Sequence, residues 1–322
     1  MRKNVLVLGL GIGSVYVDEL SKTHDVDTLD NNPELDTTYN ELSDLEVIDR
    51  KKMYDIAIVC LPNFLHEPAI EALRDLADII LVEKPGLPSL PEWQRMRTEC
   101  EVEGTRLVMA KNNMYRKGLG EFFDLVDVMI DHGSVKKVCI SWVNNARIPN
   151  PGSWFTDKDR AWGGVGRDLM PHLLNELYMT MYTDPADEPC DWIKSAKLTQ
   201  RYDIDSASKL CGDPEYANGD ATGVYNVDDR AVIVAEDDGV EYHLTADWAH
   251  DYGVEDVGIS VELTEGYMLY RLGLCPNECY GDMVNTMLAF VDDQTFWEEQ
   301  AEIDDFTLGA IDYLYENGGE NV

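Results

Sequence analysis

Basic side chains are scarce in this sequence. Of its 322 residues, 26 are Lys or Arg and 62 are Asp or Glu, so the formal net charge at pH 7 is −36. A surface this acidic repels nucleic acid and anionic membranes, and we expect neither as a partner. Two explanations of the acidity stay open: adaptation to high salt, or an ordinary acidic enzyme. Full stability in dilute buffer would count against adaptation to salt.

Long apolar runs and clustered cysteines are also missing. No apolar stretch is long enough to span a membrane, and residues 1–4 lead directly into an apolar strand without a signal-peptide core. Of the seven cysteines, only Cys275 and Cys279 are close in sequence, and no His or Cys cluster completes a metal site around them. We therefore expect no bound metal, reduced thiols and a cytoplasmic protein.

The N-terminal third has the pattern of a dinucleotide-binding fold. Apolar residues 4–8 predict a strand, a turn with Gly9, Gly11 and Gly13 follows, and residues 15–20 predict a helix. The glycines let the backbone turn tightly and approach a pyrophosphate at the positive end of the helix. Ser14 stands where the strict pattern has a third glycine, so a plain tight turn remains the alternative.

An acidic residue ends the next predicted strand, residues 26–30. Asp30 lies about twenty residues after the glycine turn, where a carboxylate that binds the ribose hydroxyls is expected. It would repel a 2′-phosphate, and Asn31 and Asn32 offer no arginine to bind one. The sequence therefore predicts NAD in preference to NADP. The alternative is a cap or turn residue before Pro33.

Apolar strands and helices then alternate, which predicts a doubly wound parallel sheet in a domain of residues 1–113. Residues 55–61 and 79–82 read as strands buried on both faces. Lys84 would stand at the carboxyl end of the second of these strands, where open α/β sheets bind ligands. The alternative for Lys84 is an ordinary charged loop residue.

Several motifs in this order resemble one known family. They are the Gly-x-Gly turn, Asp30, Cys60-Leu61-Pro62-Asn63 with His66, Glu83-Lys84-Pro85, and a glycine-rich segment from Trp162 that leads into Asp168-Leu169-Met170-Pro171-His172. Together they resemble the glucose–fructose oxidoreductase, inositol dehydrogenase and rhizopine-catabolism (Gfo/Idh/MocA) family over most of the chain. Trp162, Arg167 and Met170 depart from the family's usual residues, so its usual substrate does not carry over.

The resemblance implies hydride transfer at a sugar or polyol carbon. Carried onto this chain, the catalytic residues are Lys84, Asp168 and His172. The implied cofactor contacts are Gly9, Gly11, Ile12, Gly13, Asp30, Asn31, Cys60, Leu61, Pro62, Asn63, His66, Glu83 and Lys84. The candidate substrate contacts are Lys84, Tyr115, Arg116, Arg147, Trp154, Asp168 and His172. For His66 a helix cap is an equal alternative, and for Arg147 pairing with a surface acid is favoured over clamping a substrate.

The chemistry of alcohol oxidation suits the three catalytic candidates. A base must take the hydroxyl proton, and the unperturbed pKa of a histidine such as His172 lies near neutrality. Asp168 and His172 are four residues apart, so one helix would place both on one face, with Pro171 in an early helical position. The positive charge of Lys84 would stabilise a developing alkoxide. The alternative is a capped helix with a structural histidine.

Residues 114–322 predict an α+β domain. Residues 135–144 read as a strand, and 231–235 with 240–248, and 258–263 with 267–273, read as hairpins of a large antiparallel sheet. One face should carry the substrate helix, and the family implies that the other pairs subunits into a homodimer or homotetramer. A solvated face is the alternative. The stretch 184–226 receives no assignment.

The sequence thus predicts an NAD-dependent oxidoreductase acting on a secondary hydroxyl or keto group of a sugar, polyol or sugar derivative. Two rivals stay open. One is double-bond reduction or glycosidic chemistry on the same scaffold, and the other is a regulator that binds NAD or sugar without catalysis. Substrate identity, direction and oligomer count are left open.

Overall fold

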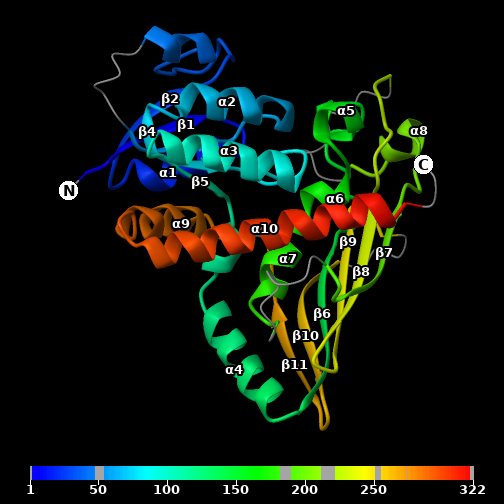
Figure 1. Cartoon of the computed structure of the whole chain (residues 1–322). Coiled ribbons are helices and arrows are strands. Elements are labelled where there is room, and N and C mark those ends of the chain that lie inside the picture. The colour runs from blue at the N-terminus through cyan, green and yellow to red at the C-terminus, as the bar shows by residue number, and fades with distance from the viewer. Residues whose placement is uncertain are drawn as a thin grey trace. The chain divides into compact units, whose positions relative to one another are not determined.

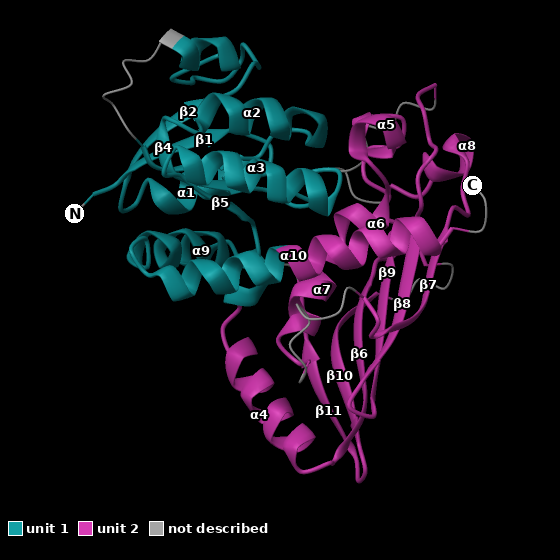
Figure 2. Ribbon diagram, in the orientation of Figure 1, with its two compact units in different colours: residues 1–115, 275–304 teal, residues 116–274, 305–322 magenta. Residues whose placement is uncertain are grey.

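The computed structural model describes residues 2–47, 54–181, 190–211, 222–250, 255–273 and 275–319. Figure 2 shows two compact units, one of residues 1–115 and 275–304 and the other of residues 116–274 and 305–322. This division differs from a single boundary after residue 113, because 275–304 returns to the first unit. The reason is packing, since Met283, Val284 and Met287 are buried in one apolar cluster with Val5 and Ile56.

The first unit is built on a five-stranded sheet in the order β2-β1-β3-β4-β5 (Figure 1). Its strands are β1 Asn4–Leu8, β2 Asp25–Leu29, β3 Tyr54–Val59, β4 Ala77–Val82 and β5 Arg106–Met109. All four pairings are parallel. The strand order changes direction between β1 and β3, and open α/β sheets bind ligands beside the carboxyl ends of the strands at such a switch point.

Helices of the first unit follow the predicted alternation. They are α1 Gly13–Leu20, α2 His66–Leu73, α3 Leu90–Val102, α9 Glu278–Ala289 and the first part of α10 Gln294–Asn317, with the 3₁₀ helices η1 Leu42–Val47, η2 Asn63–Leu65 and η3 Asn112–Tyr115. Ser89 caps α3, because its side chain accepts a hydrogen bond from the backbone N–H of Glu92. In α10, the carboxylate of Asp304 pairs with the fully buried Lys111 Nζ at 2.5 Å, which ties this segment to the end of β5.

The second unit contains a six-stranded sheet in the order β11-β10-β6-β9-β8-β7. Its strands are β6 Val135–Val143, β7 Ile193–Thr199, β8 Arg230–Asp237, β9 Val240–Asp247, β10 Asp256–Leu263 and β11 Tyr267–Arg271. β6 pairs with β9 in parallel, and the other four pairings are antiparallel. Both predicted hairpins are confirmed, whereas β7 lies in the stretch that the sequence left unassigned.

The second unit also contains helices. These are α4 Leu119–Asp131, α5 Lys158–Ala161, α6 Val165–Asp168, α7 Met170–Tyr178, α8 Ile204–Ala207, the 3₁₀ helix η4 Trp154–Thr156 and the end of α10. Alternation in the strands turns Ile140 of β6 and Leu244 of β9 toward Leu173 and Leu174 of α7 in one buried cluster. The sheet residues between them, such as His243, are more exposed. Subunit pairing through that other face stays a prediction.

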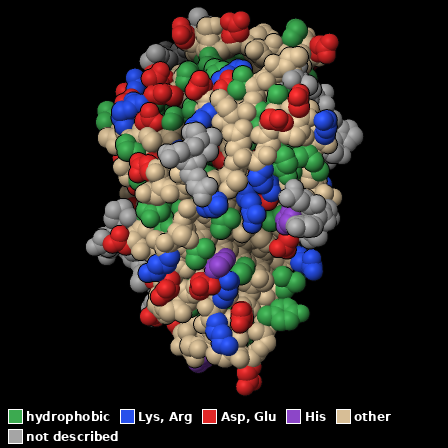
Figure 3. Space-filling model, turned by 90° about the vertical axis from the view of Figure 1, so that its right-hand side faces the viewer, with side chains coloured by type: hydrophobic (Ala, Val, Ile, Leu, Met, Phe, Trp, Pro, Cys, Tyr) green, Lys and Arg blue, Asp and Glu red, His purple; other side chains and the backbone are tan. Residues whose placement is uncertain are grey.

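Figure 3 shows a face on which acidic, basic and hydrophobic side chains are interspersed. Among the described residues, no helix combines the length and the apolar character of a membrane span.

Candidate functional site

The glycine turn between β1 and α1 uses its glycines in different ways. Gly9 has φ +84°, and a Cβ there would lie 2.6 Å from the carbonyl oxygen of Cys60. A Cβ on Gly13 would lie 3.0 Å from Val7 Cγ1, so Gly13 allows helix and strand to pack closely. Around Gly11, no atom of the described residues beyond its chain neighbours lies within 4 Å of such a Cβ. This open space fits the approach of a pyrophosphate to the backbone.

Asp30 follows β2 directly and is fixed beside the glycine turn. Its Oδ2 accepts a hydrogen bond from the backbone N–H of Leu10 at 2.6 Å, and its Oδ1 accepts one from Asn32 N–H at 2.9 Å. The residue therefore is a turn residue, as the alternative held, and also an acid beside the predicted pyrophosphate site. A carboxylate has about four lone-pair sites, so two such bonds leave acceptor capacity for ribose hydroxyls.

His66 joins the segments that follow β3 and β4. It is fully buried at the start of α2, with Nδ1 2.7 Å from the carbonyl oxygen of Gly86 and Nε2 2.9 Å from that of Leu61. Burial lowers its pKa. The imidazole thus holds the 60–63 segment at the switch point of the sheet, together with the bond from Cys60 N–H to Leu8 O at 2.7 Å. A direct cofactor contact by His66 stays a prediction.

Glu83, Lys84 and Pro85 come directly after β4, as the sequence predicted. Glu83 is buried, and its Oε1 accepts a hydrogen bond of 2.7 Å from the hydroxyl of Tyr16 in α1. Burial, and then the charge of Glu83, raise the pKa of Tyr16. The Lys84–Pro85 peptide bond is cis, and Lys84 is half-buried at the carboxyl end of β4. The lysine is therefore held at the sheet edge where ligands bind in this class of fold.

The glycine-rich segment of the second unit is pinned by Asp228. Its carboxylate accepts hydrogen bonds from the backbone N–H groups of Gly164 at 3.0 Å and Gly166 at 2.8 Å. A Cβ on Gly164 would lie 1.8 Å from the Asp228 carbonyl oxygen, so only glycine fits. Trp162, which departs from the family pattern, has φ +65°, a conformation that favours glycine. This segment sets the start of α6.

Asp168 and His172 lie on two consecutive helices. α6 ends at Asp168, Leu169 interrupts the pattern, and α7 begins at Met170 and contains Pro171 and His172. The prediction of a single helix that contains both residues is therefore wrong in detail. The backbone of Leu169 stays in the right-handed helical region, so the two side chains remain about one turn apart.

Two tryptophans contact this pair, and the sequence analysis missed both. Trp248 Nε1 donates a hydrogen bond of 2.8 Å to Asp168 Oδ2, and the ring centroid of Trp142 lies 5.3 Å from that of His172. Trp142 pairs with Ala246 across β6 and β9, which places both indoles near the carboxyl ends of these parallel strands. Continuing the alternation of buried residues in both strands would have turned both indoles toward the buried face, but it would not have placed them beside Asp168 and His172.

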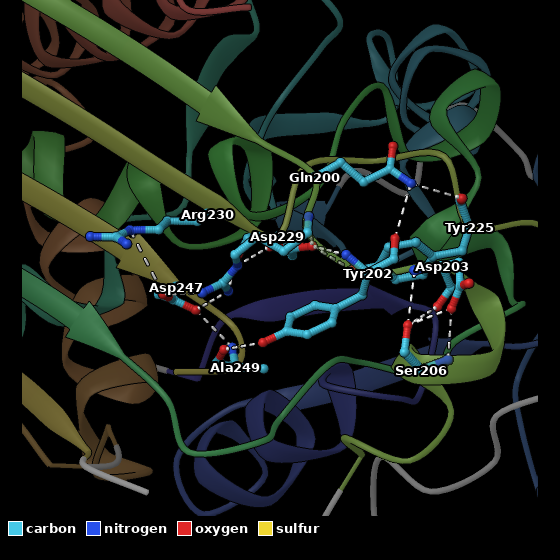
Figure 4. A network of polar contacts seen from close by, with 10 residues as sticks. Gln200, Tyr202, Asp203, Ser206, Tyr225, Asp229, Arg230, Asp247 and Ala249 are labelled. Carbon is cyan, nitrogen blue, oxygen red and sulfur yellow. Dashed lines mark hydrogen bonds and ion pairs between the residues drawn. The ribbon is translucent and has the colours of Figure 1, made fainter. Parts of the chain in front are cut away.

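A network of charges holds the end of β9 in place (Figure 4). Arg201 Nε lies 2.6 Å from Asp229 Oδ1, and its Nη2 lies 2.5 Å from Asp247 Oδ1. Both carboxylates are buried. The carbonyl oxygen of Asp229 accepts a hydrogen bond from Trp248 N–H at 3.1 Å, and Asp247 Oδ1 accepts one from Ala249 N–H at 2.9 Å. The network therefore fixes the backbone that presents Trp248 to Asp168.

A comparison of sequences identifies the first domain. The profile of the oxidoreductase family with an NAD-binding Rossmann fold matches residues 3–111. The first domain therefore matches the NAD-binding domain of the Gfo/Idh/MocA family, over less than half of the chain. Because this family binds NAD, the cofactor class predicted from the glycine turn is confirmed.

Two curated relatives are each 26% identical to this chain. One is the "Putative UDP-kanosamine synthase oxidoreductase subunit" of Amycolatopsis mediterranei, matched over 226 residues, or 69% of this chain and 60% of that protein. The other is the "D-xylose 1-dehydrogenase (NADP+)" of Haloarcula marismortui, matched over 154 residues, or 46% of this chain and 41% of that protein. The match thus spans less than two thirds of either relative.

A solved structure shares the fold of the chain over almost its whole length. The crystal structure of GenD2 from gentamicin A biosynthesis, in complex with NAD, superposes with a TM-score of 0.73 at 20% identity over 99% of this chain and 95% of that chain. The predicted fold class is therefore confirmed: a doubly wound parallel sheet followed by an α+β domain with a large, mostly antiparallel sheet.

Among the remaining substrate candidates, the two arginines and Trp154 contact other residues of the protein. Arg147 Nη1 lies 3.3 Å from Glu255 Oε1, an ion pair of the kind that the sequence favoured. Arg116 is buried and donates to the carbonyl oxygen of Gly273 at 2.8 Å. The ring of Trp154 lies 4.2 Å from that of Phe155. Tyr115 belongs to the first unit, and burial raises its pKa to about 12. Substrate contacts by these four residues stay predictions.

The structure thus brings the predicted residues together in two groups. Gly9, Asp30, Cys60 and Lys84 follow neighbouring strands at the carboxyl edge of the first sheet. In the second unit, Asp168 and His172 lie on consecutive helices that both pack on β9, and each contacts a tryptophan. Action of Lys84 on the same hydroxyl as His172 stays a prediction.

Proposed function

We propose that this chain is an NAD-dependent dehydrogenase that moves a hydride between nicotinamide and a secondary hydroxyl or keto group of a sugar, polyol or sugar derivative. The observation that carries the proposal is Lys84 at the carboxyl end of β4 in an NAD-binding domain. The relatives support a sugar or sugar derivative as the substrate, since the name of one refers to D-xylose and that of the other to UDP-kanosamine.

In this proposal each residue has one chemical task. His172 takes the proton of the substrate hydroxyl, and the ring is held against Trp142. Asp168, oriented by Trp248, stabilises the imidazolium that forms. The ammonium of Lys84 stabilises the negative charge that develops on the substrate oxygen. Bound NAD⁺ supplies the hydride acceptor, and the turn around Gly11 with Asp30 holds it.

The first experiment separates catalysis from binding. Reduction of NAD⁺ is followed at the nicotinamide absorbance with a panel of sugars, inositols and nucleotide sugars, for the wild type and for Lys84→Ala and His172→Ala. We expect both variants to lose at least ~100-fold in turnover while NAD binding, measured by calorimetry, persists. Near-normal turnover in either variant would refute its assigned role.

Matched controls exist on the surface of the same units. Lys22 pairs with Glu19 and its side chain is 61% exposed, so Lys22→Ala serves as the control for Lys84→Ala. His243 pairs with Glu241 on β9, so His243→Ala serves as the control for His172→Ala. Both controls should keep wild-type turnover.

A regulator without catalysis is the second candidate, because the same fold could bind NAD and a sugar without turnover. Its signature would be tight NAD binding with no reduction of NAD⁺ by any sugar of the panel. In that case Lys84→Ala would change ligand affinity and nothing else.

The preference for NAD over NADP rests on the charge of Asp30. Asp30→Asn removes the charge but keeps an acceptor for the N–H of Leu10. We expect the ratio of kcat/KM with NAD⁺ to that with NADP⁺ to fall at least ~10-fold, because repulsion of the 2′-phosphate is lost. A wild-type enzyme that prefers NADP⁺ would refute the assignment.

A further inference from the structure

Trp142 is the aromatic residue in contact with the proposed base. Its ring and that of His172 have centroids 5.3 Å apart and planes inclined by 30°, a tilted arrangement. Trp142 lies on the helix-bearing face of the sheet, in line with the buried Val138 and Ile140 of β6. His172 is itself 7% exposed, so the contact lies largely out of water.

The charged groups around His172 come from the elements packed on α7, which are α6, β6, β9 and the end of α10. The charged groups are Arg167 and Asp168 on α6, Glu176 on α7, Asp247 on β9, Asp312 on α10 and Arg116, and Tyr242 on β9 is titratable. The charge of Arg116 lowers the pKa of Glu176, against the larger effect of burial. The helix-bearing face of β6 contributes no ionisable side chain beside Trp142 among its described residues, since Val138 and Ile140 are apolar.

Most of these groups are engaged elsewhere. Arg167 lies over the ring of Tyr315 and 3.5 Å from Asp312, and Asp247 pairs with Arg201. The hydroxyl of Tyr242 donates to the carbonyl oxygen of Thr180 at 2.9 Å.

Glu176 lies one turn after His172, but it is fully buried and its pKa is raised to about 8, mainly by burial. It therefore adds little charge at pH 7. Of the acidic groups named above, Asp168 lies about one turn before His172, and Trp142 supplies an aromatic ring in contact with it.

We propose that Trp142 is a positioning residue for the base, and that its ring face stabilises the imidazolium form of His172. The π face of an indole is negative and attracts a cation, and this attraction grows when the pair is desolvated. The neutral imidazole, which is present before the reaction, gains less. The proposal rests on the proposed function, in which the hydroxyl proton moves to His172 while the hydride moves to NAD⁺.

The kinetic test compares Trp142→Leu with Trp142→Phe. Loss of the aromatic face destabilises the imidazolium, so the acidic limb of the kcat/KM profile for alcohol oxidation should move to lower pH. We expect a shift of about 0.5 to 1 pH unit for the Leu variant and a smaller shift for the Phe variant, which keeps a π face. A limb that stays in place in Trp142→Leu, with thermal melting like that of the wild type, would overturn the proposal.

A second measurement does not depend on turnover. The imidazole protons of His172 are followed by NMR as a function of pH in the full chain without substrate, with the signal assigned by its absence in His172→Gln. The titration midpoint should fall in Trp142→Leu and be largely restored in Trp142→Phe. An unchanged midpoint would overturn the proposal even if no sugar were oxidised. Conversely, a shifted midpoint without turnover would count against the proposed function alone.

Discussion

The indole Nε1 of Trp248 donates a hydrogen bond of 2.8 Å to Oδ2 of Asp168. The two residues are far apart in the sequence, and the sheet brings them together, because Trp248 directly follows β9 and Asp168 ends α6. Trp248 is 1% exposed, so the only polar atom of its side chain is hydrogen-bonded out of water. The orientation of the proposed catalytic aspartate therefore depends on a residue of the sheet.

Trp248→Phe removes the donor and keeps an aromatic ring. A hydrogen bond to a charged group contributes about 1.5–3 kcal/mol, so we expect kcat/KM for the proposed reaction to fall roughly 10- to 150-fold. Steady-state kinetics measure the loss, and a melting curve checks that the fold is retained. Wild-type kinetics in a folded Trp248→Phe variant would show that the bond does not serve catalysis.

We expect Gly9→Ala to lower the stability of the fold and Gly11→Ala to lower the affinity for NAD. In Gly9→Ala, the new Cβ would lie 2.6 Å from the Cys60 carbonyl oxygen, at a residue with φ +84°. We therefore expect the free energy of unfolding to fall by about 2–4 kcal/mol. In Gly11→Ala the new Cβ meets no described atom within 4 Å, so melting should not change. Its NAD affinity should nevertheless fall at least ~10-fold, because the methyl group fills space meant for the pyrophosphate. Calorimetric titration with NAD measures this affinity. Normal affinity in Gly11→Ala would contradict the assigned phosphate site.

Arg201→Met should destabilise the second unit strongly. It leaves Asp229 and Asp247 buried without their shared guanidinium, and loss of one partner of a buried ion pair costs about 3–5 kcal/mol. Arg230→Met is the matched control, since Arg230 is 45% exposed and its Nε lies 3.9 Å from Asp247 Oδ2. Urea unfolding should show a change below about 1 kcal/mol for this control. Equal effects of the two substitutions would contradict a structural role of the network.

The buried carboxyl group of Glu176 should make the stability of the fold depend on pH. Neither of its carboxyl oxygens has a hydrogen-bond partner among the described residues, and burial raises its pKa from 4.5 to about 8. Between these values the unfolded chain releases the proton and the folded chain keeps it, so stability falls as pH rises. The loss through this group is at most about 1.4 kcal/mol per pH unit.

Glu176→Gln removes this titration and keeps the size of the side chain. Relative to the wild type, the variant should therefore gain stability between pH 5 and pH 8, which urea unfolding at several pH values measures. A difference between the two proteins that does not vary with pH would show that Glu176 is ionised in the folded chain.

Local patterns were sufficient for the first domain. Runs of buried β-branched residues, the glycines after β1 and the acid after β2 all act through neighbours in sequence, so strands, turn and the positions of Asp30 and Lys84 were predictable. The hairpins of the second sheet were predictable for the same reason, whereas β7 was not, because its exposed residues, such as Lys194, Ser195 and Lys197, hide the strand pattern.

Residue identity and short-range spacing were enough to place the glycine turn, the lysine after β4 and the Asp-x-x-x-His pair, because backbone conformation and helical periodicity are local properties. The return of 275–304 to the first unit, the indoles of Trp142 and Trp248 beside Asp168 and His172, and the burial of Glu176 came from folding alone. Each of these depends on which strands become neighbours in a sheet and which faces they then bury, and such long-range pairing leaves no mark in a local stretch of chain.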